Sequence, residues 1–225
     1  MNRKLLLNLP AALEKMRSLS SGAPVHEAER RTRGDPFKIL VFTMLSARSR
    51  DASTIKAVER LFTVADSPQR IAALGQKKLE GLLYGIGFFR AKSKHLIAMC
   101  RILSERGGVP DTLDGLLALP GVGRKTANIV LARAFGESAI GVDVHVHRIS
   151  NRLGLVETRK PQETEKELVR IIPGPLLRTL NRDIVAFGQT VCTPRRPKCG
   201  ICPLNRSCFR SGVKERCPGC RYGVR

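Results

Sequence analysis

The 225-residue chain contains 40 Lys and Arg against 19 Asp and Glu, a formal net charge of +21. No apolar run approaches the roughly 20 residues that cross a bilayer, and Leu5–Leu7 is too short for the core of a signal peptide, which excludes a membrane or secreted protein and favours a soluble, cytoplasmic one. The charge favours a polyanionic partner, nucleic acid before a membrane surface, although a basic proteome or a ribosome-associated protein would show the same balance.

The first part of the chain predicts an amphipathic helix within residues 1–20, started or bent around Pro10, followed by a polar loop from Ser20 to Gly34. Asp35 and Pro36 are residue types that favour the N-cap and the first turn of a helix. Residues 37–45 are apolar on nearly every face, so this helix is predicted to lie in the core. Further helices are predicted over 51–62 with Asp51 as cap, over 68–73 and over 89–105.

Two loops in this region are candidates for contact with nucleic acid. The buried helix ends in small and basic residues that include Arg48, although an ordinary polar loop would look the same. Phe88 follows a Gly-Ile-Gly turn, where a large apolar side chain either packs into the core or acts as a wedge between base pairs.

Residues 113–134 predict a helix, a glycine turn and a second helix. Gly121 and Gly123 bracket one residue, which is typical of a tight turn that approaches a ligand closely. The backbone N–H groups that begin the second helix suit a phosphate, and Arg124 and Lys125 add positive charge there. Taken alone, Lys125 is most simply explained as a solvated cation or a phosphate contact.

Helices are also predicted over 144–153, 161–172 and 175–188, and no segment alternates well enough for a strand, so the predicted fold is all-α. Asp143 is placed to cap the first of these helices. His145 and His147 follow it, and His147 is expected to be structural or a phosphate contact.

Four cysteines near the C-terminus are separated by six, two and five residues in a segment rich in proline and glycine: Cys192, Cys199, Cys202 and Cys208. Four thiolates in such a loop can converge on one metal centre, and the chemistry alone suits zinc or an iron–sulfur cluster. Cys217 and Cys220 form a further CxxC. A second, incomplete metal site or a redox pair are alternatives, but we expect a disordered segment or incidental thiols.

Three of these motifs resemble one family. Leu119–Asn128 (LPGVGRKTAN) resembles the helix-hairpin-helix of the DNA glycosylase superfamily, and more closely its endonuclease III branch. Residues 142–148 (VDVHVHR) and the cysteine spacing are similar to the same branch. The resemblance implies a helix-hairpin-helix DNA glycosylase fold, with two helical domains, a DNA cleft between them and a C-terminal iron–sulfur loop at 192–208. The domains would comprise residues 28–137, and residues 1–27 with 138–225.

The resemblance also implies base-excision DNA repair by a bifunctional glycosylase. Such an enzyme removes oxidised or damaged pyrimidines through a lysine Schiff base and then cleaves the abasic site by β-elimination. Lys125 matches the family's Schiff-base lysine, and Asp143 matches its catalytic aspartate. The implied cofactor is a 4Fe–4S cluster on the four cysteines, and the implied partner is double-stranded DNA with damaged bases or abasic sites. We expect a monomer that acts at the nucleoid.

The family's void-filling glutamine is replaced by Arg48 here, and its intercalating leucine is replaced by Phe88, so the preference for lesion and opposite base stays open. The hairpin is expected to contact phosphates and to hold a monovalent cation, and His145 is expected to border the pocket. The residues expected to contact DNA are Arg48, Phe88, Leu119, Gly121, Val122, Gly123, Arg124, His145, Arg195, Arg196 and Lys198.

Two alternatives remain. A non-catalytic helix-hairpin-helix protein would bind DNA without chemistry, but binding alone does not need Asp143. A monofunctional mismatch (thymine or uracil) glycosylase is the other, but such relatives lack a lysine at the position of Lys125.

Overall fold

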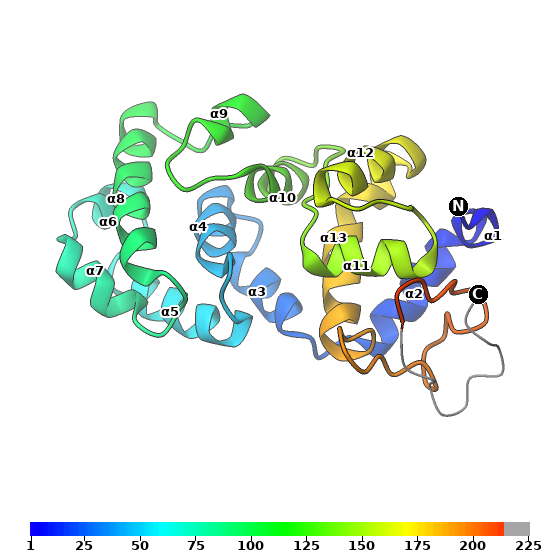
Figure 1. Ribbon diagram of the computed structural model, residues 1–225. Coiled ribbons are helices and arrows are strands. Elements are labelled where there is room, and N and C mark those ends of the chain that lie inside the picture. Colours follow the sequence, from blue (N-terminus) through cyan, green and yellow to red (C-terminus); the bar gives the residue numbers. More distant parts are fainter. Residues whose placement is uncertain (214–225) are drawn as a thin grey trace. The chain divides into compact units, whose positions relative to one another are not determined.

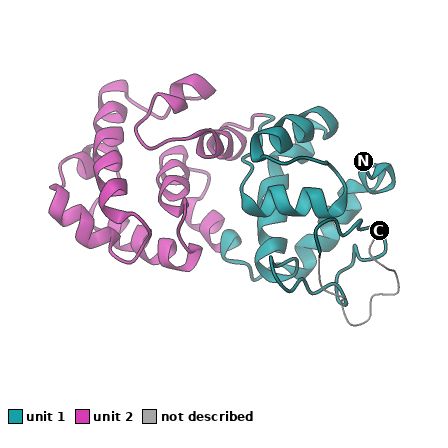
Figure 2. Ribbon diagram, in the orientation of Figure 1, with its two compact units in different colours: residues 1–26, 138–225 teal, residues 27–137 magenta. Residues whose placement is uncertain are grey.

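The computed structural model describes residues 1–213 as thirteen α-helices joined by turns and loops, with no strand among those residues (Figure 1). The all-α class predicted from the sequence is confirmed. The chain divides into two compact units: one is Glu27–Glu137, and the other is Met1–His26 together with the chain from Ser138 onward (Figure 2). Cys217 and Cys220 lie outside the described residues, and no helix within 1–213 has the length and apolar character needed to cross a membrane.

The unit Glu27–Glu137 is built around one buried helix. It contains, in chain order, most of α3 (Pro24–Thr32), then α4 (Pro36–Ser46), α5 (Asp51–Val64), α6 (Pro68–Ala72), α7 (Gln76–Leu83), α8 (Phe89–Arg106), α9 (Leu113–Leu117) and α10 (Arg124–Ala134). Helix α4 packs against α5, α8 and α10, and α6 and α7 pack against α8. Asp35 caps α4, since its Oδ1 accepts the backbone N–H groups of Phe37 and Lys38 at 2.8 and 3.1 Å. The predicted cap and the predicted burial of this helix are confirmed.

The second unit joins the two ends of the described chain. It contains α1 (Arg3–Leu7), α2 (Leu9–Leu19), α11 (Val144–Leu153), α12 (Pro161–Ile171), α13 (Gly174–Thr190) and the loop that follows α13. Helix α13 packs against α2, α11 and α12. The side chain of Asn2 donates hydrogen bonds to the backbone oxygens of Leu153 and Ser207, at 2.9 and 2.6 Å. The first residues of the chain therefore contact both α11 and the cysteine loop.

Two local predictions were wrong. The segment expected to be a polar loop contains α3, because Ala28 and Thr32 are buried on one side of it and Glu27 pairs with Arg30 and Arg31 on the exposed side. Helix α5 begins at Asp51 with Arg50 as N-cap, so Asp51 is not its cap. In the N-terminal region, a helix starts around Pro10 as predicted: α2 begins at Leu9, and proline in its first turn loses no helical hydrogen bond. The short α1 precedes it and ends at Leu7.

Candidate active site

The glycine turn between α9 and α10 is fixed by its own packing. Leu119 and Val122 are buried in the unit's core, and the N–H of Val122 donates to the oxygen of Leu119 at 3.1 Å. Gly121 has a φ of +79°, and a Cβ there would lie 2.8 Å from Cε of Met44 and 2.9 Å from Cβ of His95. Both the conformation and the space therefore require glycine at this position.

Gly123 has a different reason to be glycine. It is the N-cap of α10 with a φ of −100°, and a Cβ there would have nothing within 4 Å. Gly123 brings no capping side chain to α10, and the backbone N–H groups at the start of a helix suit an anion. The packing of the protein itself does not demand glycine here. A backbone that another molecule approaches closely would demand it.

The first two residues of α10 are both cations. Arg124 is exposed, whereas Lys125 is half-buried and is followed by a run of buried residues from 126 to 132. Lys125 therefore lies at the boundary between the buried part of α10 and the exposed Arg124.

Asp143 caps α11, as the sequence predicts. Its Oδ1 accepts the backbone N–H groups of His145 and Val146, each at 2.9 Å. Val146 is fully buried and Asp143 is half-buried. The two hydrogen bonds fix the orientation of the carboxyl group.

The first turn of α11 is also joined to the cysteine loop. Nη2 of Arg148 lies 3.2 Å from Nδ1 of His145 and donates to the backbone oxygen of Cys192 at 2.9 Å. His147 instead lies 2.7 Å from Oγ1 of Thr164, which supports the structural role expected for it. His145 is thus linked to the cysteine loop through Arg148.

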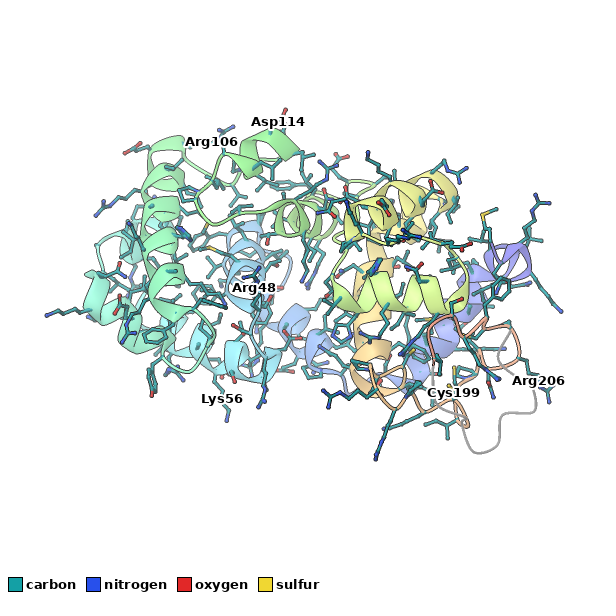
Figure 3. All side chains as sticks on the ribbon, viewed as in Figure 1. Arg48, Lys56, Arg106, Asp114, Cys199 and Arg206 are labelled. Atoms are coloured by element: carbon teal, nitrogen blue, oxygen red, sulfur yellow. The ribbon has the colours of Figure 1, made fainter. Side chains whose placement is uncertain are left out.

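The four cysteines of the C-terminal loop surround one pocket in the second unit, of about 400 Å³ including the part open to solvent. Figure 3 labels Cys199, on the loop that follows α13. Within residues 1–213, no three His, Cys, Asp or Glu side chains converge closely enough to share one metal ion. Four thiols around one pocket are a donor set that suits an iron–sulfur cluster.

The protein holds this loop with a buried cation. Arg152, 5% exposed, donates to the backbone oxygens of Thr193 and Pro194, both at 2.7 Å. Burial raises the pKa of the Cys202 thiol to about 11 and also raises the pKa of Cys208. Metal ligation requires thiolates, so a cluster that binds here displaces protons from these two groups.

Three cations project from the first part of the same loop. Arg195, Arg196 and Lys198 are all exposed, while Cys192 and Cys199 on either side are partly buried. The N–H of Lys198 donates to the oxygen of Val191 at 2.9 Å, which fixes the loop beneath its charged side chains. The first part of the cysteine loop therefore presents positive charge to solvent.

Arg48 and Phe88, forty residues apart in the sequence, lie together. Cζ of Arg48 is 5.9 Å from the centre of the Phe88 ring, a distance typical of a cation–π contact. Phe88 is 64% exposed, so the alternative that it packs into the core is wrong. Figure 3 shows Arg48 on the loop after α4.

The candidate residues fall into two groups. Arg48, Phe88, the glycine turn and Lys125 belong to the unit Glu27–Glu137, whereas Asp143, His145 and the cysteine loop belong to the other. The sequence interpretation missed two buried cations that support these groups, Arg152 and Lys92. Each lies in a helix at a position that gives no sign of its contacts, which are mostly to backbone oxygens.

Comparisons with known proteins identify the same family as the sequence motifs. Residues 41–174 match the model of the HhH-GPD superfamily base excision DNA repair protein, and residues 192–208 match the iron–sulfur binding domain of endonuclease III. The second match confirms the expected iron–sulfur cofactor. Endonuclease III of Thermotoga maritima is 47% identical to this chain, over 77% of the chain and 83% of the relative.

Two solved structures share the fold. A non-covalent endonuclease III–DNA complex matches with a TM-score of 0.79 and 34% identity, covering 90% of this chain and 94% of that one. A trapped endonuclease III–DNA covalent intermediate with an estranged adenine matches with a TM-score of 0.73 and 34% identity, covering 87% of this chain and 95% of that one.

Proposed function

Because this chain belongs to the endonuclease III family of base-excision DNA repair proteins, we propose that Lys125 is its nucleophile and Asp143 its catalytic carboxylate. The enzyme is a DNA glycosylase and abasic-site lyase that acts on double-stranded DNA. Its substrates are oxidised or otherwise damaged pyrimidines and abasic sites. It works in the cytoplasm at the nucleoid, where DNA is present and thiolates stay reduced.

The reaction needs an amine and a carboxylate. Nζ of Lys125 forms a bond to C1′ of the damaged nucleotide as the bond from C1′ to the base breaks, and the base leaves with the electron pair and takes up a proton. Asp143 stabilises the positive charge that develops on the sugar. The sugar ring opens to a Schiff base, which acidifies C2′. Loss of a C2′ proton then expels the 3′ phosphate oxygen, and water releases the lysine.

The position of Lys125 is the observation that carries this proposal. A phosphate bound by the N–H groups at the start of α10 would lie within one helical turn of the lysine, which is half-buried rather than fully solvated. The carboxylate of Asp143 is already oriented by the two hydrogen bonds that cap α11, so capping and catalysis use the same side chain.

The cysteine loop supports binding rather than chemistry. We assign the iron–sulfur cluster to Cys192, Cys199, Cys202 and Cys208, which share one pocket. When bound, the cluster supplies a rigid cross-link between the ends of the loop. The exposed Arg195, Arg196 and Lys198 contact DNA phosphates, and Arg48 and Phe88 occupy the gap left by the extruded nucleotide.

Borohydride trapping tests the nucleophile. The wild-type enzyme should form a covalent complex with a duplex that contains an oxidised pyrimidine, and Lys125→Gln should form none. Arg124→Gln, which removes the neighbouring cation from the same turn, should weaken DNA binding but still be trapped. Efficient trapping of Lys125→Gln would show that another amine attacks. Base release without trapping by the wild type would identify a monofunctional glycosylase.

A further inference from the structure

The buried amine of Lys92, in the first turn of α8, is bonded to one short segment of the chain. The side chain is 8% exposed. Its Nζ donates to the backbone oxygens of Leu45 and Ala47, both at 2.7 Å, and to Oγ of Ser49 at 2.8 Å. An ammonium group has three N–H donors, so each has an acceptor, and all three acceptors lie at the end of α4 or in the loop after it.

The same contacts join this loop to the turn before α8. Oγ of Ser49 also accepts the N–H of Gly87 at 3.0 Å. A Cβ on Gly87 would lie 2.6 Å from the backbone oxygen of Arg48, so the two segments approach as closely as backbones can. Lys92 and Ser49 together therefore hold the loop that carries Arg48 against the turn that carries Phe88.

Both of those residues have an unfavourable backbone. Arg48 has a φ of 54° and Phe88 a φ of 59°, a region that residues with a side chain rarely occupy. Surrounding contacts must over-determine such conformations for them to persist, and they are concentrated at functional sites. The contacts of Lys92 and Ser49 lie next to both residues in the chain or in space.

We propose that Lys92 is a positioning residue that holds Arg48 and Phe88 as one rigid unit, and that this unit recognises the base left unpaired when the lesion is extruded. The inference rests on the proposed function, in which Arg48 and Phe88 contact DNA. The Phe88 ring supports the guanidinium at 5.9 Å, and the guanidinium can only donate hydrogen bonds. Because Lys92 and Ser49 fix the backbones that carry the pair, less conformational entropy is lost when DNA binds.

A buried cation is otherwise poorly suited to this position. Burial lowers the pKa of Lys92 to about 8, because a charge in the core loses its hydration. The neighbouring Ser93 and Leu96 are buried on the same helix, so an apolar side chain would serve packing alone. The ammonium group of Lys92 donates to the backbone oxygens of Leu45 and Ala47. Carbonyl groups at the end of a helix have no partner within the helix, and an apolar side chain could not bind them.

A double-mutant cycle tests the proposal. The variants are Lys92→Met, the pair Arg48→Ala/Phe88→Ala, and the three combined, with kcat/KM for excision measured on a duplex. A 2-aminopurine opposite the lesion reports by fluorescence whether the unpaired base is unstacked. Lys92→Met should lower kcat/KM about tenfold and reduce the fluorescence change in the wild-type background, but change either little when Arg48 and Phe88 are already absent.

Three control measurements distinguish a loss of positioning in Lys92→Met from a loss of folding. Lys94→Met removes the same charge from an exposed position of α8 and should leave kcat/KM unchanged. β-Elimination on single-stranded abasic DNA, which has no opposite base, should be retained by Lys92→Met. If Lys92→Met does not fold, Ser49→Ala removes one acceptor and the Gly87 contact, and should show the same non-additivity with a smaller effect.

The possible outcomes are distinct. If Lys92→Met lowers kcat/KM by the same factor in both backgrounds, it acts through general stability and the positioning role is wrong. If Arg48→Ala/Phe88→Ala itself leaves excision and fluorescence unchanged, the DNA contacts assigned under the proposed function are wrong, and the unit has nothing to recognise. Trapping through Lys125 would be unaffected by either result.

Discussion

Nη1 of Arg152 lies 3.4 Å from Sγ of Cys192, the first cysteine of the C-terminal loop. The same buried guanidinium donates to the oxygens of Thr193 and Pro194. We expect Arg152→Met to lower the free energy of unfolding by about 3 kcal/mol, because buried acceptors of a charged donor lose their partner. Iron content per chain should fall as the loop loosens. Arg206→Met, at an exposed position of the loop (Figure 3), should keep both values, and full iron in a stable Arg152→Met would contradict the prediction.

The two glycines of the turn should respond differently to alanine. Gly121→Ala should cost about 2 kcal/mol or more in unfolding free energy, since it forces a side chain into a positive φ and against Met44 and His95. Gly123→Ala meets open space at an ordinary φ, so its stability should stay within about 0.5 kcal/mol of wild type. Its DNA dissociation constant should nevertheless rise. Unchanged DNA affinity would mean that no ligand approaches this backbone.

Asp143 allows its two roles to be separated. Asp143→Asn keeps an oxygen that can cap α11 and removes the charge, so denaturant unfolding should be close to wild type while the excision rate falls by at least about a hundredfold. Asp143→Ala should lose the same activity and about 1 kcal/mol of stability as well. Wild-type excision by Asp143→Asn would leave the residue as a cap only.

Arg48 predicts an opposite-base preference that substitution should change. An arginine pairs best with the two acceptors of guanine, whereas a glutamine pairs with the donor and acceptor of adenine. Arg48→Gln should therefore shift relative kcat/KM from lesions opposite guanine toward lesions opposite adenine. Duplexes that differ only in the opposite base measure this ratio, and an unchanged ratio would exclude Arg48 from base recognition.

The pH dependence of stability tests the burial of Lys92. Its pKa is about 8 in the folded protein against an ordinary 10.5, so between these values the unfolded chain binds more protons than the folded one. The unfolding free energy of the wild type should then rise relative to Lys92→Met from pH 8 to 10.5, by at most about 1.4 kcal/mol per pH unit. Chemical denaturation at several pH values measures the difference. A difference that falls with pH would mean that the three hydrogen bonds outweigh the loss of hydration.

Local signals in the sequence were reliable where a few adjacent residues determine the structure. The caps of α4 and α11 follow from Asp35 and Asp143, and the cysteine spacing indicates a shared metal centre. Helix α3 was missed because its polar composition hides a face that only tertiary packing buries, at Ala28 and Thr32.

The contacts that hold Arg48 and Phe88 in place could not be predicted from local sequence patterns. The closeness of Arg48 and Phe88 depends on how two distant loops pack, and Lys92 bonds to backbone oxygens that every residue has. A lysine on a helix is usually solvated, so nothing in the sequence distinguishes Lys92 from the exposed Lys94. Contacts of a side chain with backbone become visible only when the fold is known.

The second unit combines residues 1–26 with residues from Ser138 onward, and this affects the order in which the parts of the protein can fold during translation. Residues 27–137 can close their own core as soon as they leave the ribosome, whereas α2 must wait for α13 and Asn2 for Ser207. Iron can therefore be inserted only when synthesis has passed Cys208. A nascent chain therefore contains the glycine turn and Lys125 within a complete unit before Cys208, the last of the four cysteines, has been added.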